Sequence, residues 1–306
     1  MKRFLIILML SLAAASYADA QNCVSKETDM KFFTSVNVSD QFSLTLRKGT
    51  GYVLKTNIDE RIEPFLIAYV QNDVLYLDID RKKFTPELKK ALRTAQGNDP
   101  VLEAEVSVPL LNMLEINGDA VVKGADVIET ESFVLKAAEK ASVTDLEVMC
   151  RNAEVNVSRS SVVNAEINAS SVLKISSSGT SKTYVEHRGD SLSIASTGSS
   201  AIEAVIEVKG LVVDNSGMSS VNIVSGKAGS LMVDASGSAR FNAADVAVPS
   251  AYMVQSGSSR SVVNVTDTLK VNLVGNSALE FKGNPYIDLE KIVSSTLTRY
   301  DATSSK

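Results

Sequence analysis

The sequence predicts an all-β fold, a parallel β-helix (solenoid) of about nine turns with 19–20 residues each. The first observation is a repeating unit, in which an apolar-x-apolar triplet is followed by a Ser-Gly turn, as in Leu211–Gly217 and Leu231–Gly237. The second is the spacing of its leading apolar residue, which recurs in steps of mostly 19 or 20 residues at Leu114, Phe133, Ala153, Leu173, Leu192, Leu211, Leu231, Tyr252 and Leu269. One such unit cannot bury its own apolar face, so successive units must stack on one another.

The alternation of side chains sets the register of each expected strand. Leu211 and Val213 should face the interior, whereas Val212 and Asp214 should face outward, because successive residues of a strand point to opposite sides. Like strands of neighbouring turns then pair in parallel about 4.8 Å apart, which gives a stack roughly 38 Å long.

The turns carry a glycine for a steric reason, because a sharp corner between short strands often needs a positive φ. The expected turn glycines are Gly179, Gly198, Gly217, Gly237 and Gly257. In earlier turns, Glu139 and Arg159 occupy this position. The hydroxyl residues before the glycines form an expected ridge of Ser178, Thr197, Ser216, Ser236 and Ser256. This ridge either caps the turns or offers a polar edge for a glycan or a second copy of the chain.

The first 20 residues read as a signal peptide. Lys2 and Arg3 precede the apolar run 4–12, and Ala18-Asp19-Ala20 forms a small-x-small cleavage site. The apolar run is too short for a membrane span, and no later segment approaches the required length. We therefore expect an exported protein, on the cell surface, in the periplasm or secreted.

Residues 21–110 should form a β-rich N-terminal part of the solenoid. Residues 21–30 are polar and expected to be frayed, and strands are expected over 32–38, 42–47, 52–56, 74–80 and 101–108. The Gly-Thr-Gly sequence at 49–51 predicts a hairpin loop between the second and third of these strands. Thr85-Pro86-Glu87 predicts the start of a short helical insertion over 85–96, lying on the sheet. The repeat solenoid proper covers 111–282, and a C-terminal cap and polar tail cover 283–306.

Charge and composition restrict the partners. The chain has 306 residues, a formal net charge of −5, one histidine and two cysteines. An acidic chain lacks the basic surface that nucleic acids require, and it has no electrostatic reason to bind an anionic membrane. Cys23 and Cys150 could pair in an oxidising compartment or remain free thiols, and Cys23 also follows the leader closely enough to raise lipidation as an alternative.

A family resemblance follows from these segments. The sequences FSLTLRKG (42–49), NDVLYLDI (72–79) and VPLLNMLEINGDA (108–120) precede the Ser-Gly turn repeats. Together they resemble the secreted bacterial family described as putative auto-transporter adhesin, head GIN domain, over roughly residues 30–282. The resemblance implies a right-handed β-helix of the pectin-lyase-like type without retained catalytic residues, a role in adhesion, and possible oligomer formation. Glu139 and Arg159 depart from the family's turn pattern.

Few residues suggest catalysis or metal binding. His187 lies in a charged triplet and is expected at a solvated corner, and two cysteines without close spacing give no zinc site. The steps of 19–20 residues lack the six-residue subperiod of hexapeptide acyltransferases. Asp214 and Asp234 recur one turn apart, so they are either solvated repeat positions or a pair of calcium ligands, and no cofactor is expected.

The sequence favours a non-enzymatic exported binding or adhesion module for a glycan or protein ligand. One alternative is a glycan-processing β-helix enzyme, for which the charged group Asp78, Asp80, Arg81 and Lys82 supplies the candidates. Another is an envelope scaffold that associates with itself. Ser191 and Thr268 lie in Asp-Ser-Leu and Asp-Thr-Leu tripeptides, which resemble an O-glycosylation signal of some envelope bacteria.

Overall fold

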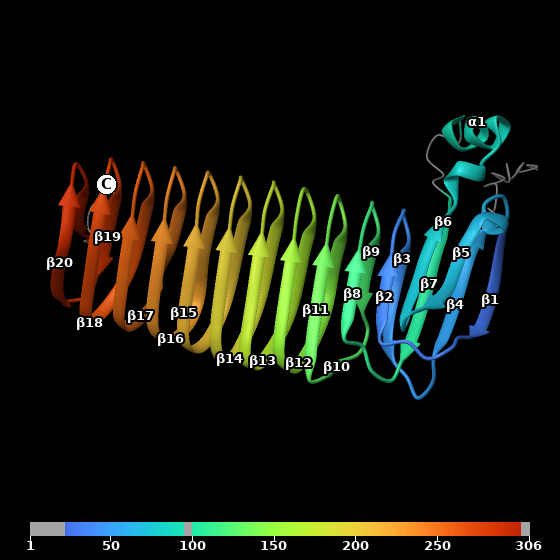
Figure 1. The fold of residues 1–306 in the computed structure, drawn as a ribbon, viewed down its shortest axis with the longest axis horizontal. Coiled ribbons are helices and arrows are strands. Elements are labelled where there is room, and N and C mark those ends of the chain that lie inside the picture. Colours follow the sequence, from blue (N-terminus) through green and yellow to red (C-terminus); the bar gives the residue numbers. More distant parts are fainter. Residues whose placement is uncertain (1–21, 95–99, 301–306) are drawn as a thin grey trace, which may run out of the picture.

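The computed structural model describes residues 22–94 and 100–300, and it confirms a β-solenoid of about nine turns with one helix (Figure 1). The strands are β1 (Cys23–Asp29), β2 (Ser35–Val38), β3 (Ser43–Lys48), β4 (Val53–Asp59), β5 (Leu66–Gln71), β6 (Val74–Ile79), β7 (Leu102–Val108), β8 (Met113–Ile116), β9 (Val121–Gly124), β10 (Ile128–Glu129), β11 (Ser132–Ala137), β12 (Ser142–Val157), β13 (Val162–Ser177), β14 (Lys182–Ser196), β15 (Ala201–Asn215), β16 (Ser220–Ala235), β17 (Arg240–Gln255), β18 (Arg260–Val274), β19 (Ala278–Lys282), β20 (Tyr286–Val293) and β21 (Thr296–Arg299).

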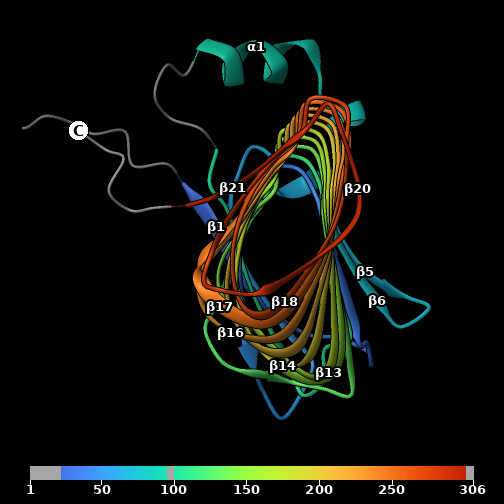
Figure 2. The ribbon, with the colours of Figure 1, turned by 90° about the vertical axis from the view of Figure 1, so that its left-hand side faces the viewer.

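Each long strand from β12 to β18 forms most of one turn and pairs in parallel with the next along the chain. The first half of β12 pairs with β9, and its second half pairs with β11, so the strand bends from one face of the solenoid to the other. We call these the first face and the second face. Viewed along the stack, the turns superimpose as flattened loops (Figure 2).

The inward and outward register is confirmed. Leu211 and Val213 are buried, whereas Val212 and Asp214 are exposed. The buried apolar side chains form one cluster that runs from Phe33 to Phe281 along the interior. Because each turn contributes only a few aliphatic side chains, stability depends on the contact between neighbouring turns.

Two expected positions in the repeat are wrong. Leu231 pairs with Ala251, not with Tyr252, and Ala251 is the buried residue. Leu114 pairs with Leu135, two residues beyond the expected Phe133. Tyr252 is the larger apolar residue of the two and therefore fits the repeat pattern in the sequence. In the structure, however, Ala251 fills the interior position and the Tyr252 ring lies on the outer face.

The N-terminal turns are stacked out of sequence order. On the second face, β2 lies between β6 and β8; on the first face, β3 lies between β7 and β9. Strands β4 and β5 then pair antiparallel with β7 and β6, and β1 pairs antiparallel with β4. These antiparallel strands cover the N-terminal end of the parallel stack.

This arrangement corrects three expectations. Strands β3 and β4 do not form a hairpin, because β7 lies between them. The segment expected to be frayed forms β1, held by seven paired residues on β4. Residues 286–299 continue the stack as a further turn, since β20 pairs with β18 and β21 with β19. Residues 1–21 and 301–306, which include the expected leader and the last part of the tail, lie outside the described residues.

The predicted helix is present as α1 (Pro86–Thr94), preceded by the 3-10 turns η1 (Glu63–Phe65) and η2 (Arg81–Lys83). The Thr85 hydroxyl accepts a hydrogen bond from the Leu88 backbone N–H at 3.2 Å, as a helix N-cap should. Leu88 and Leu92 are half-buried against the core. The helix therefore attaches to the N-terminal end of the solenoid, at its rim (Figure 1).

Candidate functional site

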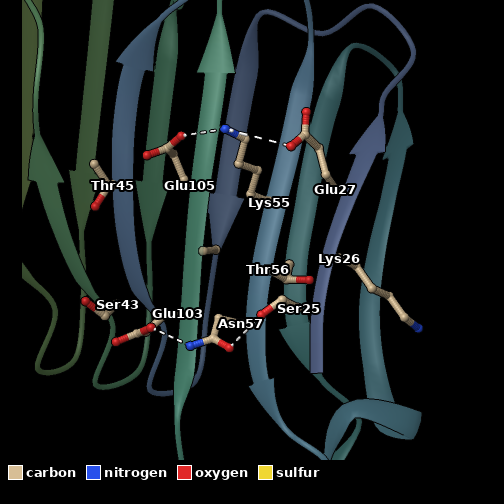
Figure 3. A pocket seen from close by; sticks show the side chains of 11 residues that line it. Ser25, Lys26, Glu27, Ser43, Thr45, Lys55, Thr56, Asn57, Glu103 and Glu105 are labelled. Carbon is tan, nitrogen blue, oxygen red and sulfur yellow. Dashed lines mark hydrogen bonds and ion pairs between the residues drawn. The ribbon is translucent and has the colours of Figure 1, made fainter. Parts of the chain in front are cut away.

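A polar groove lies on the first face, near the N-terminal end, across strands β3, β7, β4 and β1. Its volume is about 550 Å³. Figure 3 shows that its side chains come from all four strands and that most carry a polar group. This part of the sheet contains the antiparallel strands, so its surface differs from the regular repeat that follows.

The strand register places the outward side chains of the groove in two rows. One row consists of Ser43, Glu103, Asn57 and Ser25, and the other of Thr45, Glu105, Lys55 and Glu27, each named in spatial order from β3 to β1. The rows arise because residues two apart on a strand point to the same side. The four strands thus convert separate stretches of sequence into one polar surface.

The first row is a chain of hydrogen bonds. The Ser25 hydroxyl donates to the Asn57 amide oxygen at 3.1 Å, and the Asn57 amide nitrogen donates to a Glu103 carboxylate oxygen at 2.9 Å. These bonds fix the Asn57 side chain between two strands. The second oxygen of the Glu103 carboxylate can accept hydrogen bonds from a ligand.

The second row is organised by charge. The Lys55 ammonium lies 3.5 Å from the Glu105 carboxylate and 3.8 Å from that of Glu27. Arg47 donates to Glu105 at 2.7 Å from beside the groove. The Arg47 hydrogen bond, with the nearby charge of Lys55, lowers the pKa of the Glu105 carboxyl. The groove therefore presents fixed acceptors and one central cation, which is an arrangement for binding polar groups.

The turn glycines and the ridge lie along one edge of the solenoid. The five predicted glycines have φ values between +69° and +77°, and Glu139 (+69°) and Arg159 (+60°) adopt the same conformation. The turn is thus kept where the glycine is missing. Of the ridge residues, Thr197 is exposed and Ser178, Ser216, Ser236 and Ser256 are half-buried.

The turns are capped by a second set of hydroxyls, which sequence reasoning missed. The hydroxyl of Ser181 donates to the carbonyl of Ser178 at 2.8 Å, and Ser200 donates likewise to Thr197 at 2.8 Å. Ser219 makes the same bond to Ser216 at 2.6 Å. These three serines are buried and recur every 19 residues, a periodicity that could have identified them. Ser178, Thr197 and Ser216 of the ridge therefore supply the turn carbonyls that these buried serines cap.

The charged group considered for an enzyme is divided among local contacts. Arg81 pairs with the carboxylate of Asp40, and Lys83 lies 3.0 Å from Asp80. Asp78 is half-buried on β6, and burial raises the pKa of its carboxyl. Lys82 is exposed in η2. The Asp78 carboxylate accepts a hydrogen bond from the Ile79 backbone N–H at 2.8 Å, so Asp78 and Asp80 have different hydrogen-bond or ion-pair partners.

The stacked pair Asp214 and Asp234 consists of adjacent, exposed residues on β15 and β16. Within residues 22–94 and 100–300, no three His, Cys, Asp or Glu side chains are grouped so that they could hold one metal ion. The tripeptide residues Ser191 and Thr268 occupy the same corner of β14 and β18, immediately before the buried Leu192 and Leu269.

The expected solvated corner at His187 is wrong. Its side chain is 1% exposed, and Nδ1 lies 2.7 Å from the carbonyl oxygen of Ile167, to which it donates. Burial lowers the pKa of the imidazole. The charged neighbours Glu186 and Arg188 point outward, which made the whole triplet look solvated in the sequence.

Both cysteines are free. Cys23 lies exposed on β1, whereas Cys150 is half-buried on β12, where burial raises the pKa of its thiol to about 11. Strands β4, β7, β3 and β9 separate their strands, a distance of roughly 24 Å at the usual strand spacing. A disulfide requires the two sulfur atoms to be bonded, so Cys23 and Cys150 do not form a bridge at this separation.

Comparison with known proteins places this geometry in a family. The family model described as putative auto-transporter adhesin, head GIN domain, matches residues 32–170 and 153–285. No curated protein matches the sequence. Within the described residues, no helix has the length and apolar character needed to cross a bilayer.

Three solved structures share the fold. A putative adhesin from Parabacteroides merdae is 15% identical with a TM-score of 0.50, and a putative adhesin from Parabacteroides distasonis is 15% identical with a TM-score of 0.53. A putative lipid binding protein from Parabacteroides distasonis is 15% identical with a TM-score of 0.56. Each alignment covers 92% of this chain and 98% of the other. From the repeat architecture and the match over most of its length, the chain belongs to the family of putative auto-transporter adhesins with a head GIN domain.

Proposed function

We propose that the chain is a non-enzymatic, exported binding module that acts in adhesion, and that the N-terminal groove holds a hydroxyl-rich ligand such as a glycan. The observation that carries the proposal is the pair of ordered polar rows across β3, β7, β4 and β1. Membership of a family of putative adhesins supports an exported or surface protein.

The chemistry of the rows suits sugar hydroxyls. Each hydroxyl both donates and accepts, and the groove offers carboxylate acceptors in Glu103 and Glu105 beside donors in Asn57, Ser43 and Thr45. The Asn57 amide is already oriented by Ser25, so its ordering cost is met before a ligand binds. The groove lies on paired strands, which keep these groups in place.

The test is a glycan array followed by calorimetry with the best ligand. We expect Asn57→Ala and Glu103→Gln each to weaken binding at least tenfold, because each removes an oriented polar group. Asn242→Ala is the matched control, since Asn242 is an outward asparagine on β17 of the same face, bonded at 2.9 Å to Asn222 on the preceding turn. Equal affinity of all three variants for the ligand would remove the groove from the proposal. Ligand turnover in the same mixtures would favour the enzyme alternative instead.

The hydroxyl ridge is a second proposed contact surface, for a glycan or another copy of the chain. Its exposed Thr197 and half-buried serines repeat at the spacing of the turns. Replacing Thr197 and Ser216 together by valine and alanine should reduce binding only if the ridge contributes. The groove variants and this ridge variant therefore separate the two surfaces.

Location and modification need separate tests. Protease treatment of intact producing cells, with a periplasmic control protein, should remove a surface-exposed module and spare a periplasmic one. Full protection would contradict direct adhesion and favour a periplasmic scaffold. We also propose that Ser191 and Thr268 carry O-linked glycans. Intact mass of protein from its native source should exceed the mass of the polypeptide and fall in steps for Ser191→Ala and Thr268→Val, whereas a mass equal to that of the polypeptide would refute the modification.

A further inference from the structure

The last described turn leaves an open strand edge. Strand β20 pairs with β18, and β21 pairs with β19, each on one side only among the described residues. Apolar side chains are exposed along this edge: Tyr286 (72%), Leu289 (57%) and Val293 (48%). At the N-terminal end, the antiparallel strands β1 and β5 are likewise each paired on one side only among the described residues. An open edge with apolar side chains is a template for pairing with another strand.

Strand β20 contains a bulge at its centre. Val271 pairs with Leu289 and Asn272 pairs with Lys291, so Glu290 is the extra residue. Ile287, Leu289 and Ile292 are paired with Leu269, Val271 and Leu273, which are buried, and therefore face the interior. Asp288 and Lys291 are paired with Lys270 and Asn272 and face outward.

The bulge changes which residues share a face. In a regular strand, residues separated by an odd number of positions lie on opposite faces. Across the bulge, Ile287 and Ile292 both face inward, and Asp288 and Lys291 both face outward. The strand is thus symmetric in character about the bond between Leu289 and Glu290. The outward charged residues Asp288 and Lys291 lie at equal distances on either side of this bond, and so do the inward Ile287 and Ile292.

We propose that two copies of the chain associate tail to tail, with β20 of each copy paired antiparallel about a two-fold axis at Leu289 and Glu290. Ile287 then lies opposite Ile292 of the second copy, and Asp288 lies opposite Lys291, and each pair occurs twice. Such a two-fold contact is self-complementary by construction. The interiors of the two solenoids become continuous, which covers Leu289 and the half-buried Leu297 of β21.

In this register Leu289 of the second copy lies opposite Glu290, whose side chain points to the other, outer face. Its carboxylate lies 2.6 Å from the Lys270 ammonium and accepts a hydrogen bond from the Tyr252 hydroxyl at 2.9 Å, on the outer face. The carboxylate therefore keeps its partners within one copy. Two solenoids joined in this way form one longer rod with an antiparallel seam at its centre.

Charge exchange tests the pairing. Sedimentation velocity of the purified protein over a concentration series should show a monomer–dimer equilibrium. Asp288→Lys and Lys291→Asp should each weaken the dimer about tenfold or more, because each places two like-charged pairs at the seam. The double variant Asp288→Lys/Lys291→Asp should restore it. Asp214→Lys, a change of the same charge on the exposed surface of β15, should leave the dimer unchanged.

The outcomes separate the possible assemblies. A monomer at all concentrations, or a double variant no stronger than the single ones, would overturn the proposal. A ladder of species larger than a dimer would indicate head-to-tail stacking and also overturn the two-fold contact. Because Asp288 and Lys291 are exposed, the variants should fold normally, and unchanged far-UV circular dichroism of the monomer checks this. Glycan binding at the N-terminal groove is independent of this contact.

Discussion

Gly237→Val tests whether the turn glycines are required by conformation. Gly237 has a φ of +71°, and a Cβ built there would lie 2.9 Å from the carbonyl oxygen of Gly217 on the preceding turn. The left-handed conformation costs a residue with a Cβ about 1–2 kcal/mol. Displacing the neighbouring backbone adds about 1–3 kcal/mol. Valine also restricts the unfolded chain more than glycine does, and this offsets only about 0.5–1 kcal/mol of the loss in stability. We expect a net loss of about 2–3 kcal/mol in the free energy of unfolding, within these ranges.

Urea unfolding followed by far-UV circular dichroism measures this loss. Met218→Val is the control, because Met218 is 70% exposed in the equivalent turn one step earlier and follows the glycine. The complementary change is Arg159→Gly, which removes the Cβ at a φ of +60°. We expect Arg159→Gly to stabilise the protein by about 0.5–1 kcal/mol. This is the cost of the left-handed conformation that the change removes, minus the cost of the extra entropy that glycine gives the unfolded chain. An unfolding midpoint of Gly237→Val equal to that of the parent would refute the conformational argument.

Three further predictions concern the interior. Val233→Asp should destabilise by about 3–5 kcal/mol, because it places an unpaired carboxylate at a fully buried position, whereas the exposed Val212→Asp should change stability by less than about 0.5 kcal/mol in the same urea assay. Burial lowers the pKa of His187 from 6.5, so as the pH falls the unfolded chain takes up a proton at this residue before the folded chain does. The free energy of unfolding should therefore decrease as the pH drops below 6.5 towards the lowered pKa. His187→Gln should remove this part of the pH dependence, and an unchanged slope of the free energy of unfolding against pH would contradict the prediction. Because the pKa of the Cys150 thiol is about 11, a thiol reagent at pH 8 should modify the exposed Cys23 well before Cys150, as peptide mass mapping would show; equal rates would contradict the burial of Cys150.

The regular part of the fold could be predicted because its signals are local. Each turn repeats its own apolar alternation and its own glycine, so the strands and their inward side chains follow from neighbouring residues. The register failed where one residue was ambiguous, as with Ala251 and Tyr252, because only contact with the adjacent turn decides between them.

The N-terminal order and the groove could not be predicted in the same way. Strand β4 follows β3 closely in sequence, yet β7 separates them in the sheet, and no local pattern encodes that choice. The polar row of Ser25, Asn57 and Glu103 comes from three strands distant in sequence, and each residue alone looks like an ordinary exposed position. His187 was misread because its position on the strand, not its charged neighbours, determines its burial.

The out-of-order N-terminal turns have a consequence for how the chain folds. Val36 on β2 pairs with Leu114 on β8, 78 positions later, whereas Leu192 on β14 pairs with Leu211 only 19 positions later. Closing the longer loop costs more entropy and is slower. Both edges of β2 and β3 therefore remain unpaired until the chain has been extended through β6 to β9. The later turns can add one at a time to a formed neighbour, so the entropic cost of closing long loops is concentrated in the N-terminal turns.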